Sequence, residues 1–251
     1  MREDLCRCRG AFSHRHHPAR GRRAFVGGVA AGAVAAAAAM PARAPRAADP
    51  APKTVLTPDQ VLRLLKEGNE QFRMDATFSG VHGRERRVEL ARGQAPYGVL
   101  VADSRVPPEL LFGRGLGELF IVRNAGNTVD ITALGSVEYG VGVFGCPLVV
   151  VLGHEGCGAV AAAVEVVEKN ASFPGVIGEM VQPIIPAVLE ARRSPGGTTL
   201  DAAVVANAKR VAARLKTQSP VVQEAVRRNR LKIVAARYDL GDGHVDWFED
   251  I

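Results

Sequence analysis

His154 and Cys157 are three residues apart in a glycine-rich segment, Gly153-His154-Glu155-Gly156-Cys157-Gly158. A turn of this kind lets an imidazole nitrogen and a thiolate converge on one zinc ion. Such a site needs at least one further ligand, which a carboxylate can supply. The spacing alone is equally compatible with a buried histidine beside an inert cysteine.

A second polar cluster, Asp103-Ser104-Arg105, offers that carboxylate. Asp103 can complete a metal site with His154 and Cys157, or it can pair with Arg105, which would keep the carboxylate ionised and oriented. In a simpler interpretation Asp103 caps a helix and Arg105 is solvated. Each cluster follows a β-rich apolar run, and ligand sites of open α/β sheets lie beyond the carboxyl ends of the strands. We therefore expect both clusters at the same edge of a sheet.

Short apolar runs alternate with helix-length segments from residue 95 onward, which indicates an α/β fold with a mostly parallel sheet. The runs are continuous, as strands buried on both faces require. Asp242-Gly243 predicts a hairpin that adds a last antiparallel strand at 244–247. The expected strands are 99–101, 119–122, 147–152 and 231–235, and the expected helices are 133–143, 158–169, 176–191 and 201–217.

An amphipathic helix is predicted over residues 57–74. Thr57-Pro58-Asp59-Gln60 combines an N-cap, a proline in the first turn and a glutamine that closes a capping box. Its apolar stripe must be buried, either on the protein's own core or on a partner subunit. The apolar side chains of this helix are Val61, Leu64, Leu65 and Phe72.

The net charge of +6 raises the question of a polyanionic partner. Of the 32 basic and 26 acidic residues, nine arginines and three acids are in residues 1–50, so the remainder carries 23 of each. The body of the protein is therefore neutral, which argues against nucleic acid as a partner and favours a small-molecule substrate.

Residues 1–44 have the pattern of a Tat-type signal peptide, which predicts a periplasmic or secreted protein. Arg22-Arg23 precedes a mildly apolar run of mostly alanine and glycine, and small residues at A-x-A spacing end at Ala44. The alternative is an uncleaved membrane anchor, but alanine and glycine contribute little to insertion. Cys6 and Cys8 are too closely spaced for a usual zinc box.

The predicted organisation is signal peptide 1–44, linker 45–56 and one domain 57–251, divided into a helical arm 57–90 and an α/β core 91–251.

Several ordered motifs resemble those of the β-class carbonic anhydrases. The resemblance extends from about Leu56 to Trp247, and it includes Glu67-Gly68-Asn69. The longer matching segments are Ala102-Asp103-Ser104-Arg105-Val106-Pro107-Pro108-Glu109, Gly115 to Asn127, Gly135-Ser136-Val137-Glu138-Tyr139 and Val151 to Ala159.

This resemblance implies the β-carbonic anhydrase fold, a Zn²⁺ cofactor, and reversible hydration of CO2 to bicarbonate and a proton in a homodimer or homotetramer. It also implies that the helix at 57–74 wraps a neighbouring subunit, which would explain why its apolar stripe is outside the main alternation of strands and helices. His154 and Cys157 match two of the family's zinc ligands, and Asp103 and Arg105 match its catalytic dyad. Gln94 matches a glutamine that contacts substrate in the cleft. The backbone amide of Gly158, at a helix start, would stabilise negative charge on an oxygen.

The family's remaining zinc ligand, a cysteine just before the Asp-Ser-Arg motif, is absent. The chain reads Val99-Leu100-Val101-Ala102-Asp103, which is about two residues short of the family pattern. Cys146 precedes His154 by eight residues along a strand, about 26 Å at about 3.3 Å per residue, which is too far to replace it. Asp103, His154 and Cys157 then remain as metal ligands, and we predict weakened zinc binding and turnover.

Three alternatives stay open. The protein is a non-catalytic homologue with weak or no zinc binding, or a hydrolase of carbonyl sulfide or carbon disulfide that uses the same ligands. In the third alternative Cys157 is a nucleophile with His154 as its base, although the sequence offers no third group to orient the histidine.

Overall fold

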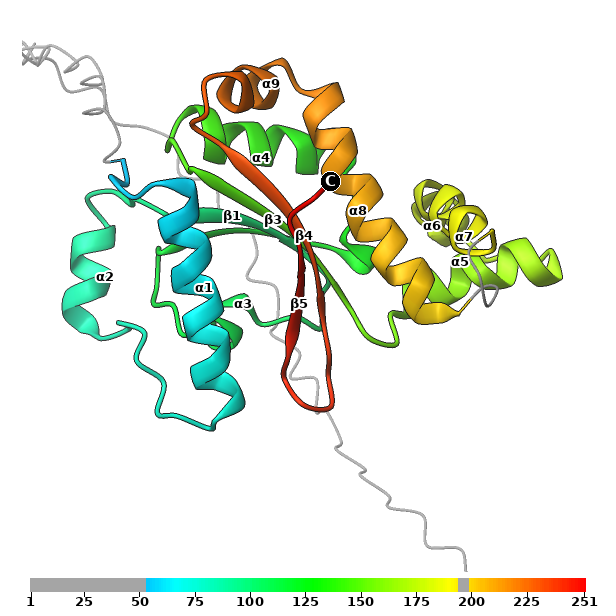
Figure 1. Cartoon of the computed structure of the whole chain (residues 1–251), viewed down its shortest axis with the longest axis horizontal. Coiled ribbons are helices and arrows are strands. Elements are labelled where there is room, and N and C mark those ends of the chain that lie inside the picture. Colours follow the sequence, from blue (N-terminus) through cyan, green and yellow to red (C-terminus); the bar gives the residue numbers. More distant parts are fainter. Residues whose placement is uncertain (1–52, 194–198) are drawn as a thin grey trace, which may run out of the picture. The chain divides into compact units, whose positions relative to one another are not determined.

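A five-stranded sheet in the order β2-β1-β3-β4-β5 forms the centre of the described part of the chain. The computed structural model describes residues 53–193 and 199–251, all within one compact unit, Ala47–Ile251. The first four strands are parallel, and β5 pairs with β4 antiparallel (Figure 1). The strands are β1 (Gly98–Ala102), β2 (Leu119–Arg123), β3 (Leu148–His154), β4 (Lys232–Tyr238) and β5 (Val245–Phe248).

Side chains of the central strands alternate between two buried faces. Val99 and Val101 pack with α4, α8 and α9 on one face, while Leu100 and Ala102 pack with α1 and α3 on the other. Helices cover both sides of the sheet in Figure 1, so the strands are apolar throughout. The helices of these layers are α1 (Pro58–Arg73), α2 (Arg84–Leu90), α3 (Pro108–Leu111), α4 (Ile131–Gly142), α8 (Leu200–Gln218) and α9 (Pro220–Arg227).

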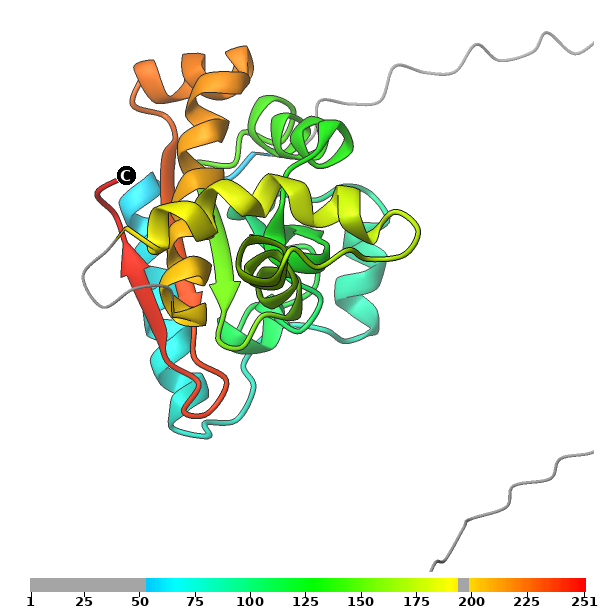
Figure 2. The same cartoon turned by 90° about the vertical axis from the view of Figure 1, so that its right-hand side faces the viewer.

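A third apolar cluster joins α5, α6 and α7 to the first half of α8. These helices lie together beside α8 in Figure 2. Two prolines divide this part of the chain, because each lacks an amide hydrogen and starts a new helical segment. The segments are α5 (Gly158–Lys169), α6 (Ile177–Val181), the 3-10 turn η2 (Gln182–Ile184) and α7 (Ile185–Ala191). A second 3-10 turn, η1 (Ala125–Asn127), follows β2.

The predicted α/β architecture is confirmed, including the antiparallel last strand. The predicted helix 176–191 is divided into α6, η2 and α7. Sequence reasoning missed α9, although its start was readable. Ser219 caps it through the amide of Val222, and Pro220 occupies the first helical position.

The helix at 57–74 forms as predicted, with both hydrogen bonds of the Thr57–Gln60 capping box. Its apolar stripe is buried on the protein's own core, the first of the two alternatives. Val61, Leu62 and Leu65 are fully or almost fully buried against the sheet, in the cluster that contains Leu100. The expected contact of this helix with a neighbouring subunit stays a prediction. The even-numbered face of β1 and β3 needs an apolar cover, and α1 supplies it.

Asn69 fastens α1 to the β4–β5 hairpin. Its side chain is buried, its Nδ2 donates to the carbonyl of Gly243 at 2.8 Å, and its Oδ1 accepts from the amide of Val245 at 3.1 Å. A Cβ at the preceding Gly68 would collide with the carbonyl of Phe112, so glycine is required for this close approach. The Glu67-Gly68-Asn69 motif thus positions α1 on the sheet.

The predicted leader 1–44 and most of the predicted linker 45–56 are outside the described residues. The same holds for Cys6, Cys8 and the nearby histidines. Among residues 53–193 and 199–251, no helix combines the length and the apolar character that a membrane crossing requires.

Replacing Asn69 by leucine should destabilise the protein by about 1–3 kcal/mol, because it leaves buried polar groups of Gly243 and Val245 without partners. Urea unfolding monitored by circular dichroism measures the change. The matched control is Glu70→Gln on the exposed side of α1, for which we expect a change within about 0.5 kcal/mol. An equal effect of the two substitutions would contradict the role assigned to Asn69.

Candidate metal centre

Three neighbouring strands end at one edge of the sheet and bring the predicted clusters together. Ala102, the last residue of β1, pairs with Arg123 of β2 on one side and with Leu152 of β3 on the other. Asp103 therefore emerges beside η1, which follows β2, and beside His154 at the end of β3. The expectation that both polar clusters share one edge is confirmed.

Asp103, His154 and Cys157 form a compact cluster of three different donor types. Their ligand atoms all lie within 4.8 Å of one another, and all three residues are buried. His154 Nε2 is 3.2 Å from Asp103 Oδ1, and Cys157 Sγ is 3.7 Å from Asp103 Oδ2. The sequence predicted these three as the remaining ligands, and the structure brings them together.

The orientation of His154 leaves one nitrogen aimed at the cluster. Its Nδ1 lies 2.7 Å from the carbonyl oxygen of Glu155, to which an Nδ1–H donates. Its Nε2 is buried and has no hydrogen bond of good geometry, although Asp103 is at ion-pair distance. A backbone carbonyl on one ring nitrogen fixes the tautomer in which the other can bind a metal.

Backbone amides hold the carboxylate of Asp103. Oδ2 accepts from the amide of Gly126 at 2.6 Å, and Oδ1 accepts from the amide of Arg105 at 2.9 Å and from the hydroxyl of Ser104 at 3.2 Å. Burial raises the pKa of this carboxyl, but His154 and the two amides outweigh burial and hold the pKa well below its usual range. Asp103 is therefore ionised at neutral pH.

The pKa of the neighbouring His154 is shifted in the opposite direction, upward. Burial lowers the pKa of His154, but its interactions with Asp103 and Cys157 outweigh burial and raise the pKa to about 10. In the metal-free protein at neutral pH, His154 therefore carries a proton that stabilises the buried Asp103. A metal ion that binds here must displace this proton, because only the neutral imidazole is a ligand.

The donor set fits zinc. Nitrogen, sulfur and carboxylate oxygen are the three ligand types of protein zinc sites, and catalytic sites use three protein ligands with a fourth position open. The unpartnered Nε2 of a fully buried histidine is the feature that a ligand would satisfy. Here Nε2 faces both Asp103 and Cys157, so the groups converge on a point.

Arg105 contributes its backbone to Asp103, not its guanidinium. The side chain is exposed, and no ion pair of the described residues joins it to Asp103. Instead, the guanidinium of Arg123 donates to the backbone carbonyls of Asp103 and Ser104. The arginine that supports the Asp103 loop thus comes from the end of β2.

Gln94 and Cys146 lie at the opposite edge of the sheet. Gln94 is half-buried in the loop before β1, and β1 separates it from Asp103 by about 16 Å at about 3.3 Å per residue. Cys146 lies just before β3, donates to the carbonyl of Pro96, and is buried, which raises the pKa of its thiol to about 12. Within this chain neither side chain reaches the cluster. Gly158, in contrast, follows Cys157 directly as the first residue of α5.

Sequence reasoning assigned no role to Gly126, whose amide makes the shortest hydrogen bond to Asp103. Gly126 has φ 75° and ψ 18°, a left-handed conformation that favours glycine. A Cβ there would lie 2.8 Å from Ile184 Cδ1 and 3.0 Å from Ala159 Cβ. The available signal was the segment Asn124-Ala125-Gly126-Asn127 directly after a strand, because asparagine and glycine favour turns.

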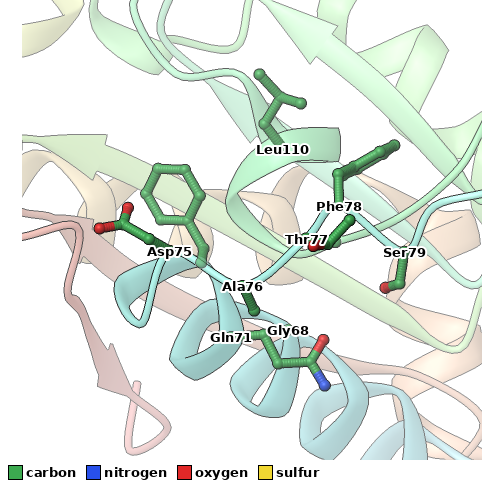
Figure 3. Close-up of a pocket in the computed structure, with 10 residues that line it drawn as sticks. Gly68, Gln71, Asp75, Ala76, Thr77, Phe78, Ser79 and Leu110 are labelled. Carbon is green, nitrogen blue, oxygen red and sulfur yellow. The ribbon is translucent and has the colours of Figure 1, made fainter.

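A separate hollow lies between the end of α1, residues 75–79 and α3 (Figure 3). Its volume is about 260 Å³, and Phe72, Phe78 and Leu110 contribute apolar surface. None of its lining residues belongs to the Asp103, His154 and Cys157 cluster. This hollow therefore has no part in the metal centre.

Comparison with known proteins identifies the family and agrees with the fold. Residues 100–245 match the sequence profile of a family described as "Carbonic anhydrase". Carbonic anhydrase 2 of Mycobacterium tuberculosis is 38% identical over 183 residues, which cover 72% of this chain and 88% of the relative.

Two solved structures have the same fold. A Coccomyxa β-carbonic anhydrase in complex with acetazolamide has a TM-score of 0.55 and 28% identity, covering 63% of this chain and 74% of that one. A structure from a study of two tetrameric β-carbonic anhydrases of Sordaria macrospora has a TM-score of 0.57 and 22% identity, covering 64% and 84%.

The ion pair of His154 and Asp103 predicts how the stability of the metal-free protein depends on pH. The pKa of His154 is raised from 6.5 to about 10, so its contribution is complete below pH 6.5 and is lost as the pH rises to about 10. Asp103 has a lowered pKa, so its contribution is present above about pH 4 and is lost in acid. In EDTA, the free energy of unfolding should fall between pH 6.5 and 10 by an amount on the order of a few kcal/mol.

Urea titrations at several pH values measure this fall, and His154→Gln is the control. The variant retains the other groups that titrate in alkali, Cys146 included, but should lose most of the decrease. A variant with the same pH dependence as the natural sequence would contradict the assignment to His154.

Proposed function

Because the chain belongs to the β-class carbonic anhydrase family, we propose that it catalyses the reversible hydration of CO2 with zinc held by Asp103, His154 and Cys157. The observation that carries the proposal is the convergence of three buried donor atoms within 4.8 Å at the carboxyl edge of the sheet. In the forward reaction a water oxygen bonds to the carbon of CO2, one carbon–oxygen π bond breaks, and a proton is released.

Each ligand has a defined origin in the fold. His154 Nε2 comes from the end of β3, Cys157 Sγ from the turn before α5, and Asp103 from the end of β1. A zinc ion supplies Lewis acidity that lowers the pKa of a water molecule from 15.7 to about 7. Glu155 holds the imidazole of His154 by its backbone carbonyl, and the amides of Gly126 and Arg105 hold the carboxylate of Asp103.

Gly158 provides an anion-stabilising group next to the ligands. Its amide lies at the start of α5, a 12-residue helix whose N-terminus favours negative charge. The residue is exposed, and no atom lies within 4 Å of the position of a Cβ. A small substrate therefore has room to bring a negatively charged oxygen to this amide.

The absence of the family's first cysteine ligand is expected to weaken this chemistry. Asp103 supplies the third ligand in its place, and a carboxylate bound to the metal is less available to accept a hydrogen bond from the attacking water. We therefore propose weakened zinc affinity and slower turnover than with two thiolates. The same observation supports a second candidate function, a non-catalytic homologue that retains the fold and has lost metal chemistry.

Gln94 supports a homo-oligomer, a homodimer or a homotetramer. The residue matches the family's substrate-contacting glutamine but lies at the opposite edge of the sheet from Asp103. A second copy of the chain is then the available source of a glutamine at the cleft. The Sordaria macrospora relatives are described as tetrameric.

We also propose that the protein is exported by the Tat route and acts in the periplasm or outside the cell. The support is the twin arginine Arg22-Arg23 before the alanine-rich run. The neutral charge of residues 51–251 is consistent with a small substrate and with no nucleic-acid partner.

Two cysteine variants test the metal centre. Cys157→Ser should weaken zinc binding at least about 10–100-fold, because it removes a ligand. Cys146→Ser is the matched control, also a buried thiol, and should retain the zinc content of the natural sequence because it lies at the other edge. Zinc per chain after dialysis and stopped-flow CO2 hydration measure both effects. Equal zinc content in the two variants would contradict the site.

Insertion of Gly-Cys between Val101 and Ala102 tests whether zinc affinity and turnover are weakened by the missing cysteine. The insertion should raise zinc affinity and turnover at least about tenfold, since it restores a thiolate. Insertion of Gly-Ser at the same place is the control for chain length and should give neither gain.

The outcomes separate the candidate functions. Stoichiometric zinc and equal turnover without the insertion would refute the proposed impairment. A natural sequence that neither binds zinc nor hydrates CO2, beside an inserted variant that does both, would establish the non-catalytic homologue. An inserted variant without zinc would refute the assignment of His154 and Cys157.

A further inference from the structure

Asn207 is a buried amide in an apolar part of α8. It is 1% exposed, and its neighbours Ala203, Val204, Ala208 and Val211 are buried apolar residues. It lies on the stripe of α8 that faces the core. A polar side chain in this position is destabilising unless its hydrogen bonds are satisfied. Its Nδ2 donates to the carbonyl of Gly126 at 2.9 Å, across 81 residues of sequence.

Gly126 is the link between Asn207 and the metal centre. Its amide donates to Asp103 Oδ2 at 2.6 Å, while its carbonyl accepts from Asn207. These hydrogen bonds act on the two peptide groups that flank one Cα, so together they restrain both φ and ψ of Gly126. Ile184 and Ala159 pack close to the same Cα and leave no space for a side chain.

The carboxylate of Asp103 depends on this turn for its orientation. Of its hydrogen-bond donors, Ser104 and Arg105 are its sequence neighbours and move with it. The donors from separate segments are the thiol of Cys157, at 3.7 Å from Oδ2, and the amide of Gly126, which binds the same oxygen at 2.6 Å. Rotation of the Gly126 peptide would therefore change the direction in which Asp103 presents its oxygens to the cluster.

We propose that Asn207 is a positioning residue of the metal centre, acting through the Gly126 peptide on the carboxylate of Asp103. The effect on metal binding rests on the proposed function, whereas the effect on the Gly126 turn does not. The hydrogen-bonded chain from α8 to Asp103 is independent of the identity of the metal.

Two variants remove the donor. Asn207→Leu preserves approximate volume without a hydrogen bond, and Asn207→Ser has a hydroxyl too short to reach the same carbonyl. The matched control is Val211→Ala, one turn further along α8, which is buried in the apolar cluster that contains Val149 and Val151 of the sheet. If the leucine variant does not fold, the serine variant carries the comparison.

The first measurement uses the full chain without metal. Hydrogen exchange of the Gly126 amide, followed by NMR, should become about tenfold faster in both Asn207 variants, the change that corresponds to one lost hydrogen bond. Val211→Ala should leave the Gly126 exchange rate within about twofold of the natural sequence once global stability is matched with urea.

The second measurement is binding of Co²⁺, followed by the thiolate-to-cobalt absorption band. The dissociation constant should rise about 10–100-fold in both Asn207 variants and should be unchanged in Val211→Ala. The intensity of the cobalt band should also change, because Asp103 is presented differently.

Unchanged Gly126 exchange and unchanged cobalt binding in the Asn207 variants would overturn the proposal. Equal effects of Val211→Ala and Asn207→Ser would overturn it as well, because the role would then be one of general stability. If the natural sequence binds no cobalt, the proposed function fails, and the Gly126 exchange rates alone decide whether Asn207 positions the turn.

Discussion

The buried carboxylate of Asp103 is the interaction on which the site and much of its surroundings depend. An ionised carboxylate in a protein interior costs several kcal/mol unless charges and hydrogen bonds compensate it. His154 and the amides of Gly126 and Arg105 supply that compensation, and they come from the ends of three strands. The sheet order, with β1 between β2 and β3, is therefore a requirement of the site as well as a feature of the fold. Moving β2 or β3 would remove one of the groups that compensate the buried charge of Asp103.

The segment that carries His154 is supported from the other side by β4 and the hairpin that follows it. His154 pairs with Tyr238 in the sheet, and the amide of Glu155 donates to the carbonyl of Tyr238 at 2.8 Å. The carboxylate of Glu155 accepts from the amide of Leu240 at 3.3 Å. Asn69 of α1 binds the same hairpin at Gly243. The helix that packs on one face of the sheet and the imidazole of His154 are therefore linked through this hairpin. A rigid frame of this kind suits a metal ligand, whose nitrogen must remain aimed at one point.

Sequence reasoning located Asp103, His154 and Cys157 because the rule it used depends only on local pattern. Apolar runs identify strands, and polar residues at their carboxyl ends share an edge in any parallel sheet. The direction of a long side chain is not encoded so locally, so the exposed position of the Arg105 guanidinium could not be derived. The surface that buries the apolar stripe of α1 is not encoded locally either, since such a stripe shows that burial is needed without showing which surface provides it. Asn207 was detectable as a polar residue on a buried helical stripe, but its partner Gly126 became visible only in three dimensions.

The proposed loss of two residues before Asp103, relative to the family pattern, is compatible with an intact fold. Side chains of a strand alternate with a period of two, so a loss of two residues returns each upstream side chain to its own face. The structure agrees with this argument, because Val99 and Val101 still face α4 and α8 while Leu100 and Ala102 face α1. The pairing of Ala102 with Arg123 and Leu152 also brings Asp103 to the correct edge. Loss of a single residue would have turned the apolar side chains of β1 to the wrong faces. In the proposed metal site, the consequence of such a shortening is thus confined to the edge of the sheet, where Asp103 would take the place of a thiolate among the ligands.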